Sequence, residues 1–316
     1  MINYNSPFAL KAFLEQEGLG MRKKFGQNFL INPQIRQSLV HSLNAMTADE
    51  VWEIGPGLGA MTKLLLEKGF IVKAFEIDIG FIQILKKIFS QDINFILIEG
   101  DIMKTWKEQP PLLLDRHTQL KRRESFLLGN LPYNIAAALI ADFIENRRIF
   151  SRIVVTIQKE VALRMAARTG SPDYSSFSVL CASVYNVKPL MLIGRDSFYP
   201  RPNVDSMGVL LESKRNDSPP DTFYPLVRSL FSSRRKTIKN NLSVFLSSRI
   251  NEFLHNKMNI SGNISLSSPL EVQELCAAVL KENSINEKER AENLEPEAFL
   301  SLAKSIDNMR LLKKEC

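Results

Sequence analysis

A glycine-rich turn between an apolar strand and a helical stretch constrains the fold of this chain most strongly. The run Val51-Trp52-Glu53-Ile54 predicts a short buried strand, and residues 55–59, GPGLG, follow it directly. Leucines at helical spacing come next. Glycines in a strand-to-helix turn let the backbone approach a ligand and leave N–H groups free to bind it. The turn therefore predicts a ligand-binding βα unit, with Gly55 and Gly57 against the ligand.

An acidic residue ends the next predicted strand. The apolar run 71–75 leads into Glu76, 21 residues after Gly55. An acid at that offset accepts hydrogen bonds from ribose hydroxyls, which indicates a cofactor that carries a nucleoside. The pattern does not say which cofactor, because Gly55-x-Gly57-x-x-Ala60 also satisfies the relaxed dinucleotide fingerprint and keeps NAD as an alternative.

Strand and helix patterns alternate from residue 51 to residue 211. This alternation predicts a doubly wound α/β fold with a mostly parallel sheet, to which the last strands add an antiparallel edge. Further strands are expected at 94–98, 125–129, 152–158 and 204–211, and helices at 81–89, 135–144, 159–168 and 175–184.

Polar residues follow two of these strands, where open α/β sheets bind ligands. Asp101 could accept from an adenine amino group or cap a turn. Asn130-Leu131-Pro132-Tyr133 suits the binding of a base amine: the Asn130 oxygen and the Leu131 carbonyl accept from NH₂, and Pro132 brings no competing N–H. Tyr133 offers a ring for stacking, worth roughly 1–3 kcal/mol per base. The alternative is a plain strand-to-helix turn capped by Asn130.

A polar, proline-containing linker at 213–221 predicts a domain boundary, with one domain at 1–212 and a helical one at 213–316. Residues 222–250 hold six basic residues and no acid, a pattern that favours a nucleic-acid interface over a solvated helix face. Helical spacing would bring Arg228, Arg235 and Lys239 near one face. The candidate RNA-binding residues are Arg228, Arg234, Arg235, Lys236 and Lys239.

The amino-acid composition limits which classes of binding partner are expected. Lys and Arg number 41 against 34 Asp and Glu, a moderate basic excess that suggests a polyanion. The three cysteines and three histidines are scattered, so we expect no disulfide framework, no metal and a reducing compartment. No signal peptide or apolar span is apparent, which predicts a cytoplasmic protein that does not enter membranes.

Taken together, these motifs resemble those of the ribosomal RNA adenine N6-dimethyltransferases that use S-adenosyl-L-methionine. The resemblance runs from Arg22 to about Leu242 and is closest to the branch acting on small-subunit (16S) rRNA. Its marks are FGQNFL at 25–30, EIGPGLG at 53–59, NLPY at 130–133, QKEV at 158–161 and FYPRPNVDS at 198–206.

The resemblance implies a Rossmann-like class I methyltransferase sheet with a smaller helical C-terminal domain. It places Asn28 and Leu30, within a basic lid at 22–30, on the cofactor, together with Gly55, Glu76 on the ribose and Asp101 on the adenine. Asn130 would contact cofactor and target, and Tyr133 and Phe198 would sandwich the target base. It also implies dimethylation of two adjacent adenosines near the 3′ end of the 16S rRNA and a part in small-subunit biogenesis. We expect a monomer.

Two features depart from the family pattern. Ala136-Ala137-Ala138 replaces the usual Ser/Thr-Thr-Pro, and the connection at 108–124 is longer than expected. Two other functions stay open: a non-catalytic rRNA-binding assembly factor, and an NAD-dependent oxidoreductase that would leave Asn130-Leu131-Pro132-Tyr133 without a role.

Overall fold

The computed structural model describes residues 2–20, 27–110, 124–214, 219–258 and 269–309. The chain divides into two compact units. The first comprises Met1–Leu163 and Tyr185–Arg215, and the second Arg164–Val184 and Asn216–Cys316. The second unit thus takes in the segment 164–184, which the sequence-based division assigns to the first domain. The basic lid residues 22–26 and most of the 108–124 connection lie outside the described residues.

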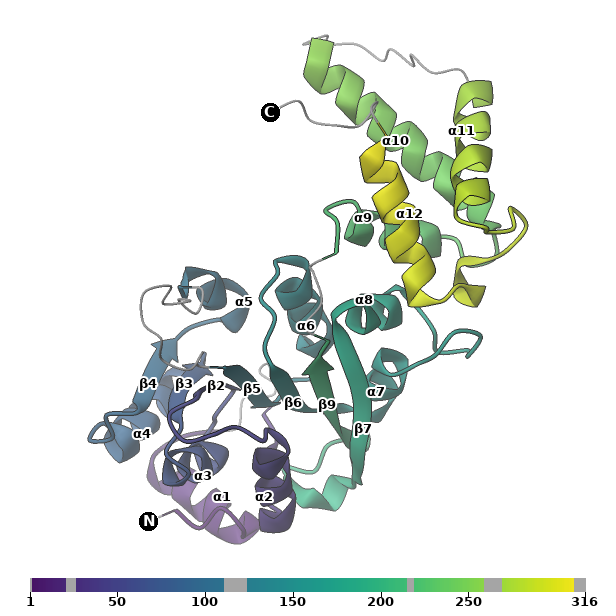
Figure 1. The fold of residues 1–316 in the computed structure, drawn as a ribbon. Coiled ribbons are helices and arrows are strands. Elements are labelled where there is room, and N and C mark those ends of the chain that lie inside the picture. The colour runs from purple at the N-terminus through teal and green to yellow at the C-terminus, as the bar shows by residue number, and fades with distance from the viewer. Residues whose placement is uncertain (1, 21–26, 111–123, 215–218, 259–268, 310–316) are drawn as a thin grey trace. The chain divides into compact units, whose positions relative to one another are not determined.

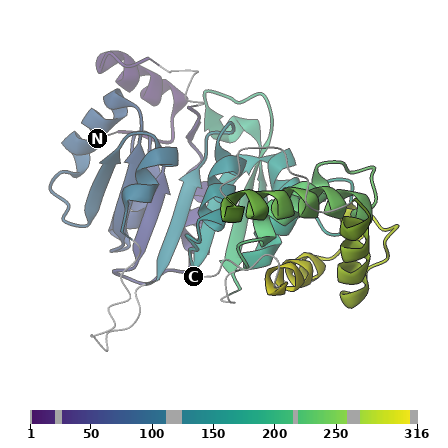
Figure 2. The ribbon, with the colours of Figure 1, turned by 90° about the horizontal axis from the view of Figure 1, so that it is seen from above.

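The first unit is built on a seven-stranded sheet of order β4-β3-β2-β5-β6-β9-β7, whose strands lie side by side in Figure 2. Strands β2 to β6 pair in parallel, whereas β9 pairs antiparallel with both β6 and β7. The α/β class and the antiparallel edge are confirmed. The strands are β2 (Glu50–Ile54), β3 (Ile71–Glu76), β4 (Phe95–Glu99), β5 (Ser125–Asn130), β6 (Arg152–Gln158), β7 (Tyr185–Ile193) and β9 (Ser206–Ser213).

Helices cover both faces of this sheet (Figure 1). On one face, apolar residues of α2 and α3 form a core cluster with β2, β3, β5 and β6. On the other, Phe143 of α6 packs edge-on against Trp52 of β2, with ring centroids 6.4 Å apart. The helices are α1 (Pro7–Gln16), α2 (Pro33–Ser42), α3 (Ala60–Glu67), α4 (Ile79–Phe89), α5 (Ile102–Thr105), α6 (Ala136–Glu145) and α7 (Lys159–Met165).

The chain order of the strands determines where a ligand can bind. From β2 the chain proceeds outward to β3 and β4, then returns to place β5 on the other side of β2. The order in which the chain adds strands therefore reverses between the parallel neighbours β2 and β5. Open α/β sheets bind ligands in the crevice at such a switch point. Gly55 follows β2 and Asn130 ends β5, so both predicted sites fall at this point.

A second, two-stranded sheet joins distant parts of the chain. Strand β1 (Phe29–Leu30) pairs antiparallel with β8 (Phe198–Tyr199). Ile31 N–H donates to the carbonyl of Ser197 at 2.8 Å, which extends the pairing by one residue. The segment that carries the predicted cofactor contacts is therefore tied to the loop that carries Phe198.

The described regular elements of the second unit are helices: α8 (Ser176–Val184), α9 (Phe223–Phe231), α10 (Ile238–Met258), α11 (Pro269–Glu282) and α12 (Pro296–Asn308). Its core contains an aromatic cluster, in which Phe231 stacks on Phe299 at 5.7 Å and meets the ring of Tyr174 at 5.9 Å. No helix in the described part of the chain is long and apolar enough to cross a membrane.

Candidate functional site

A cavity of about 280 Å³ opens at the carboxyl ends of β2, β3, β4 and β5. This is where parallel-sheet enzymes place their ligands. Residues far apart in the sequence meet here because each follows a different strand of the same sheet edge. Seven of the predicted site residues line it: Asn28, Gly55, Gly57, Glu76, Asp101, Asn130 and Pro132.

Glu76 is held by backbone N–H groups. Its Oε1 accepts from the N–H of Ile77 and of Asp78, each at 2.9 Å, and its Oε2 accepts from Gly57 at 3.1 Å. Burial raises the pKa of Glu76 to about 7, against these hydrogen bonds, which lower it. The carboxyl group is thus oriented at the end of β3 and, when ionised, keeps a free lone pair on Oε2 that can accept a further hydrogen bond.

Asp101 caps a helix and lines the cavity at the same time. One carboxylate oxygen, Oδ1, accepts from the N–H of Met103 at 3.0 Å and starts the short helix α5. Both roles proposed from the sequence are therefore compatible, because a carboxylate that caps with one oxygen keeps acceptor capacity on the other.

The glycine-rich turn leaves open space for a ligand. Gly55 has a φ of +66° and a Cβ built on it would meet no atom within 4 Å. Gly57 has a φ of +58°, and a Cβ there would lie 3.0 Å from Cε1 of Phe29. Side chains at these positions would be strained and would enter the cavity, which is why the sequence has glycine there.

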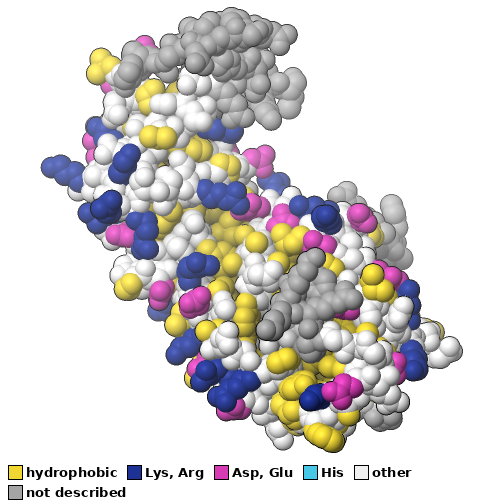
Figure 3. All heavy atoms as spheres, turned by 180° about the vertical axis from the view of Figure 1, so that it is seen from behind, with side chains coloured by type: hydrophobic (Ala, Val, Ile, Leu, Met, Phe, Trp, Pro, Cys, Tyr) yellow, Lys and Arg dark blue, Asp and Glu magenta, His cyan; other side chains and the backbone are white. Residues whose placement is uncertain are grey.

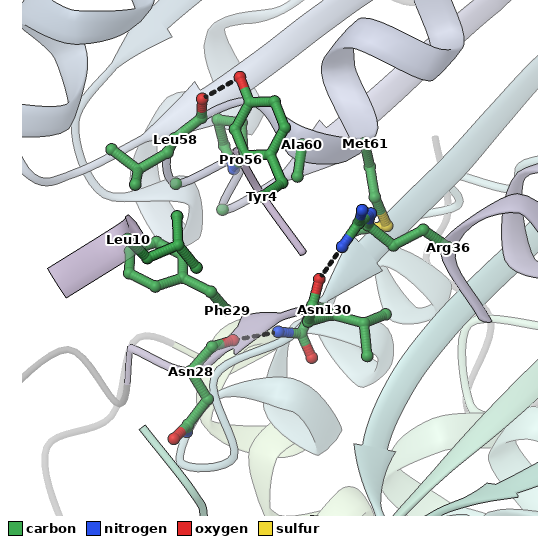
Figure 4. Close-up of a pocket in the computed structure, with 13 residues that line it drawn as sticks. Tyr4, Leu10, Asn28, Phe29, Arg36, Pro56, Leu58, Ala60, Met61 and Asn130 are labelled. Carbon is green, nitrogen blue, oxygen red and sulfur yellow. Dashed lines mark hydrogen bonds between the residues drawn. The ribbon is translucent and has the colours of Figure 1, made fainter. Parts of the chain in front are cut away.

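Asn130 is oriented by the N-terminal segment. Its Nδ2 donates to the backbone carbonyl of Asn28 at 2.6 Å. Because this partner is an acceptor, the amide nitrogen must face it, and the amide oxygen Oδ1 points away (Figure 4). The side chain thus presents an acceptor at the edge of the cavity that holds Glu76 and Asp101.

The residues after Asn130 take different positions. Pro132 lines the cavity, whereas the Leu131 side chain is buried and the Leu131 N–H donates to the carbonyl of Thr156 at 3.1 Å. Tyr133 is half-buried, and its hydroxyl lies 2.7 Å from Oγ of Ser206, which is fully buried. Sequence reasoning did not assign Ser206 a role, although it belongs to the motif at 198–206.

Phe198 lies in the core. Its side chain is 3% exposed and packs in the cluster that includes Leu30 and Leu39. It does not line the cavity with Asn130, and neither does Tyr133. Stacking of a target base between Tyr133 and Phe198 therefore stays a prediction.

A smaller adjoining cavity extends the site past the glycine turn (Figure 4). It shares Asn28, Gly55 and Asn130 with the larger cavity, and it adds Leu30, the remaining predicted cofactor contact. It also adds Arg36, which sequence reasoning missed. A signal was available, because Arg36 shares the core-facing side of α2 with Leu39 and Val40 at helical spacing.

The basic residues of the second unit do not share one helix face. The expectation of continuous helical spacing from Arg228 to Lys239 is wrong, since α9 ends at Phe231 and α10 begins at Ile238. The amide of Asn241 donates to the carbonyls of Leu230 and Ser233, which stabilises the intervening turn.

Arg234 and Lys239 pair with acidic residues of the same unit. Arg234 pairs with Glu292 at 3.1 Å and also donates to the carbonyl of Tyr174, while Lys239 pairs with Glu287 at 2.6 Å. Arg235 and Lys236 are exposed in the turn. On the face drawn in Figure 3, Lys and Arg side chains alternate with Asp and Glu instead of forming one continuous basic patch.

The family model and the relatives that match this chain point to the same protein family. Residues 18–279 match the family model of ribosomal RNA adenine dimethylase. Ribosomal RNA small subunit methyltransferase A of Treponema denticola is 47% identical over 251 residues, covering 78% of this chain and 83% of that protein. The protein of the same name from Treponema pallidum is 40% identical over 313 residues, covering 96% and 97%.

A solved structure agrees. The crystal structure of a dimethyladenosine transferase from Plasmodium falciparum superposes with a TM-score of 0.69 at 26% identity, covering 87% of this chain and 96% of that one. The strand order, the cavity at the switch point and the matched residues lead to one conclusion: the chain belongs to the ribosomal RNA adenine dimethylase family.

Proposed function

We propose that this protein transfers methyl groups from S-adenosyl-L-methionine to N6 of adenosines in small-subunit rRNA. The observation that carries the proposal is the orientation of Asn130, whose amide oxygen is directed away from Asn28 at the edge of the nucleoside-sized cavity. An amide oxygen in that position accepts a hydrogen bond from an exocyclic amine, and an adenine presents one at N6. Relatives named small subunit methyltransferase and dimethyladenosine transferase support the same reaction.

The cavity residues fit this cofactor. Methyltransferases of this family use S-adenosylmethionine, which supplies a methyl group on a positively charged sulfur and so carries the difficult chemistry. Glu76 would accept from the ribose hydroxyls, and Asp101 from the adenine amino group. The open space at Gly55 would take the chain that links ribose to the amino-acid end, with Asn28, Leu30 and Gly57 closing around it.

The protein's contribution to the reaction is alignment. The lone pair of an adenine N6 is conjugated into the ring, so the amine is a weak nucleophile. Hydrogen bonds to Asn130 Oδ1 and the Leu131 carbonyl would favour a pyramidal nitrogen and direct its lone pair, and such positioning can lower a barrier by about 7–11 kcal/mol. Pro132 adds no competing donor. Tyr133 and Phe198 would stack on the base once it has left the helix.

We further propose that the substrate is the 16S rRNA of the small ribosomal subunit, with two adjacent adenosines near its 3′ end each dimethylated during subunit biogenesis. The domain 213–316 would bind this RNA through Arg228, Arg234, Arg235, Lys236 and Lys239, all of which are exposed except the half-buried Lys239. The reaction would take place in the cytoplasm, with the protein as a monomer.

The test is transfer of labelled methyl from S-adenosylmethionine to small subunits that lack the modification, followed by nucleoside analysis. N6,N6-dimethyladenosine is the expected product. Tight binding of the subunits without methyl transfer would overturn the proposal and support a non-catalytic assembly factor. That alternative is not favoured, because Glu76, Asp101 and Asn130 are all present and share one cavity.

A further inference from the structure

Arg36 is a buried cation in the first unit. It lies on α2 and is only 5% exposed. Its Nη1 donates to the carbonyl of Leu30 at 2.5 Å, and its Nη2 donates to Oδ1 of Asn5 at 2.5 Å. Its Nε is buried and has no hydrogen-bond partner within the described part of the chain. The Nε–H of this buried guanidinium is therefore left without an acceptor among the described residues.

The charge of Arg36 is also uncompensated. Both of its hydrogen-bond partners are neutral oxygens, and no ion pair between Arg36 and a carboxylate is found in the described ranges. The segment 21–26, which the structure does not describe, contains no acidic residue. A buried charge without a counter-ion is costly, and an arginine stays protonated at any physiological pH. Such an arrangement is typical of a site that receives an anion.

The position of Arg36 limits which anion this is. Arg36 lines the smaller cavity beside Gly55, Gly57 and Asn130, which also border the larger cavity with Glu76. Figure 4 shows the guanidinium pointing into the space between Tyr4, Met61 and Asn130. A ligand with its ribose at Glu76 that passes the glycine turn reaches Arg36 with its opposite end.

We propose that Arg36 binds the α-carboxylate at the amino-acid end of S-adenosylmethionine. This inference rests on the proposed cofactor and adds a residue to its site. A carboxylate supplies both an acceptor for the Nε hydrogen and a negative charge opposite the guanidinium. One ligand group would therefore provide the missing hydrogen-bond partner and the missing counter-ion. Asn5 and the Leu30 carbonyl act as positioning groups, because their hydrogen bonds to Nη2 and Nη1 fix the guanidinium plane.

The experiment compares two ligands by calorimetry, with no catalytic turnover. S-adenosylmethionine carries the carboxylate, and decarboxylated S-adenosylmethionine lacks it but keeps the sulfonium and the amine. The parent protein should bind the first about 10- to 100-fold more tightly, the usual range for a charge-assisted hydrogen bond. Arg36→Met should lose that preference, with weaker binding of S-adenosylmethionine and unchanged binding of the decarboxylated form. Arg36→Lys should keep part of it.

The matched control is Arg148→Met. Arg148 is also partly buried with an unpartnered Nε, but it stacks on Trp52 and lines neither cavity. This variant should keep the full preference. The inference is overturned if Arg36→Met weakens the binding of both ligands equally, because Arg36 would then only support the Leu30 segment. It is also overturned if the parent protein binds both ligands with the same affinity, and this measurement requires no variant. A parent that binds neither ligand would instead overturn the proposed function.

Discussion

The Asn130 side-chain amide donates to the Asn28 backbone carbonyl at 2.6 Å, across 102 residues of chain. This bond connects the end of the central strand β5 to the segment just before β1. It fixes the orientation of the amide, since only the nitrogen can donate, and it leaves the oxygen facing away from Asn28, as the proposed contact with a substrate amine requires.

Replacing Asn130 with Ala should reduce methyl transfer by at least about 100-fold, the penalty expected when the reacting groups lose their alignment. RNA affinity should change little. Initial rates on undermethylated small subunits would measure the effect, with Asn146→Ala as control, because the Asn146 side-chain amide donates to Asp142 at the end of α6 and lines neither cavity. A rate within a few-fold of the parent would exclude Asn130 as the amine acceptor.

Cofactor affinity should rise with pH through about 7. If Glu76 binds the ribose as proposed, its ionised form would offer the free lone pair of Oε2 to the ribose hydroxyls, whereas protonation of Oε2 would remove that acceptor. Burial raises the pKa of Glu76 to about 7, so the group ionises between pH 6 and pH 8. Titration of S-adenosylhomocysteine binding across this range would show the rise, and Glu76→Gln should flatten it and weaken binding about 10-fold at pH 8. A profile that the substitution leaves unchanged would assign the titration to another group.

Glu53 should make the fold less stable as the pH rises. This fully buried carboxyl accepts from Thr62 at 2.6 Å through one oxygen, and its other oxygen has no partner among the described residues. Burial raises its pKa from 4.5 to about 7. Between these values the folded state binds more protons than the unfolded state, so the free energy of unfolding falls as the pH increases and levels off above 7.

Urea titrations of the parent and Glu53→Gln would test this. The variant should gain on the order of 1–3 kcal/mol relative to the parent between pH 5 and pH 8, because glutamine cannot ionise. Because the result is a difference between the two pH values, any pH-independent effect of the glutamine amide on the free energy of unfolding cancels. Parallel pH profiles for the two proteins would contradict the raised pKa.

Substitutions in the turn between α9 and α10 should distinguish residues that bind RNA from residues that stabilise the fold. Arg235 and Lys236 are exposed there, so replacing both with Ala should reduce the salt slope of RNA binding by about 1–2 and leave Tm unchanged. Arg234→Ala should lower Tm, because Arg234 bonds to Glu292 and to the carbonyl of Tyr174. An unchanged salt slope in the double variant would show that the turn does not meet phosphates.

The ends of the parallel strands were predictable from sequence because their signals are local. Gly55, Glu76 and Asn130 each follow an apolar run at a characteristic spacing, and parallel strands bring their carboxyl ends to one edge whatever the details of packing. Sheet class and cavity position follow from that alone.

Features that depend on tertiary contacts were not predictable in the same way. The turn between Phe231 and Ile238 exists because Asn241 takes two carbonyls that a continuous helix would bond itself. Arg36 lies in an apolar stripe, where its charge gave no hint of partners as distant as Asn5. The burial of Phe198 follows from the pairing of β8 with β1, far away in the sequence.

The segment 164–184 has a practical consequence for dissecting this protein. It belongs to the second unit, where the Tyr174 hydroxyl donates to the carbonyl of Leu294 at 2.9 Å and its ring meets Phe231. Strands β7 and β9, which complete the sheet of the first unit, come after it in the chain. Neither unit is a continuous stretch of polypeptide. A fragment that stops at residue 212 would keep Tyr174 and Cys181 but lose what buries them, so an isolated catalytic unit requires a redesigned 164–184 connection and cannot be obtained by truncation.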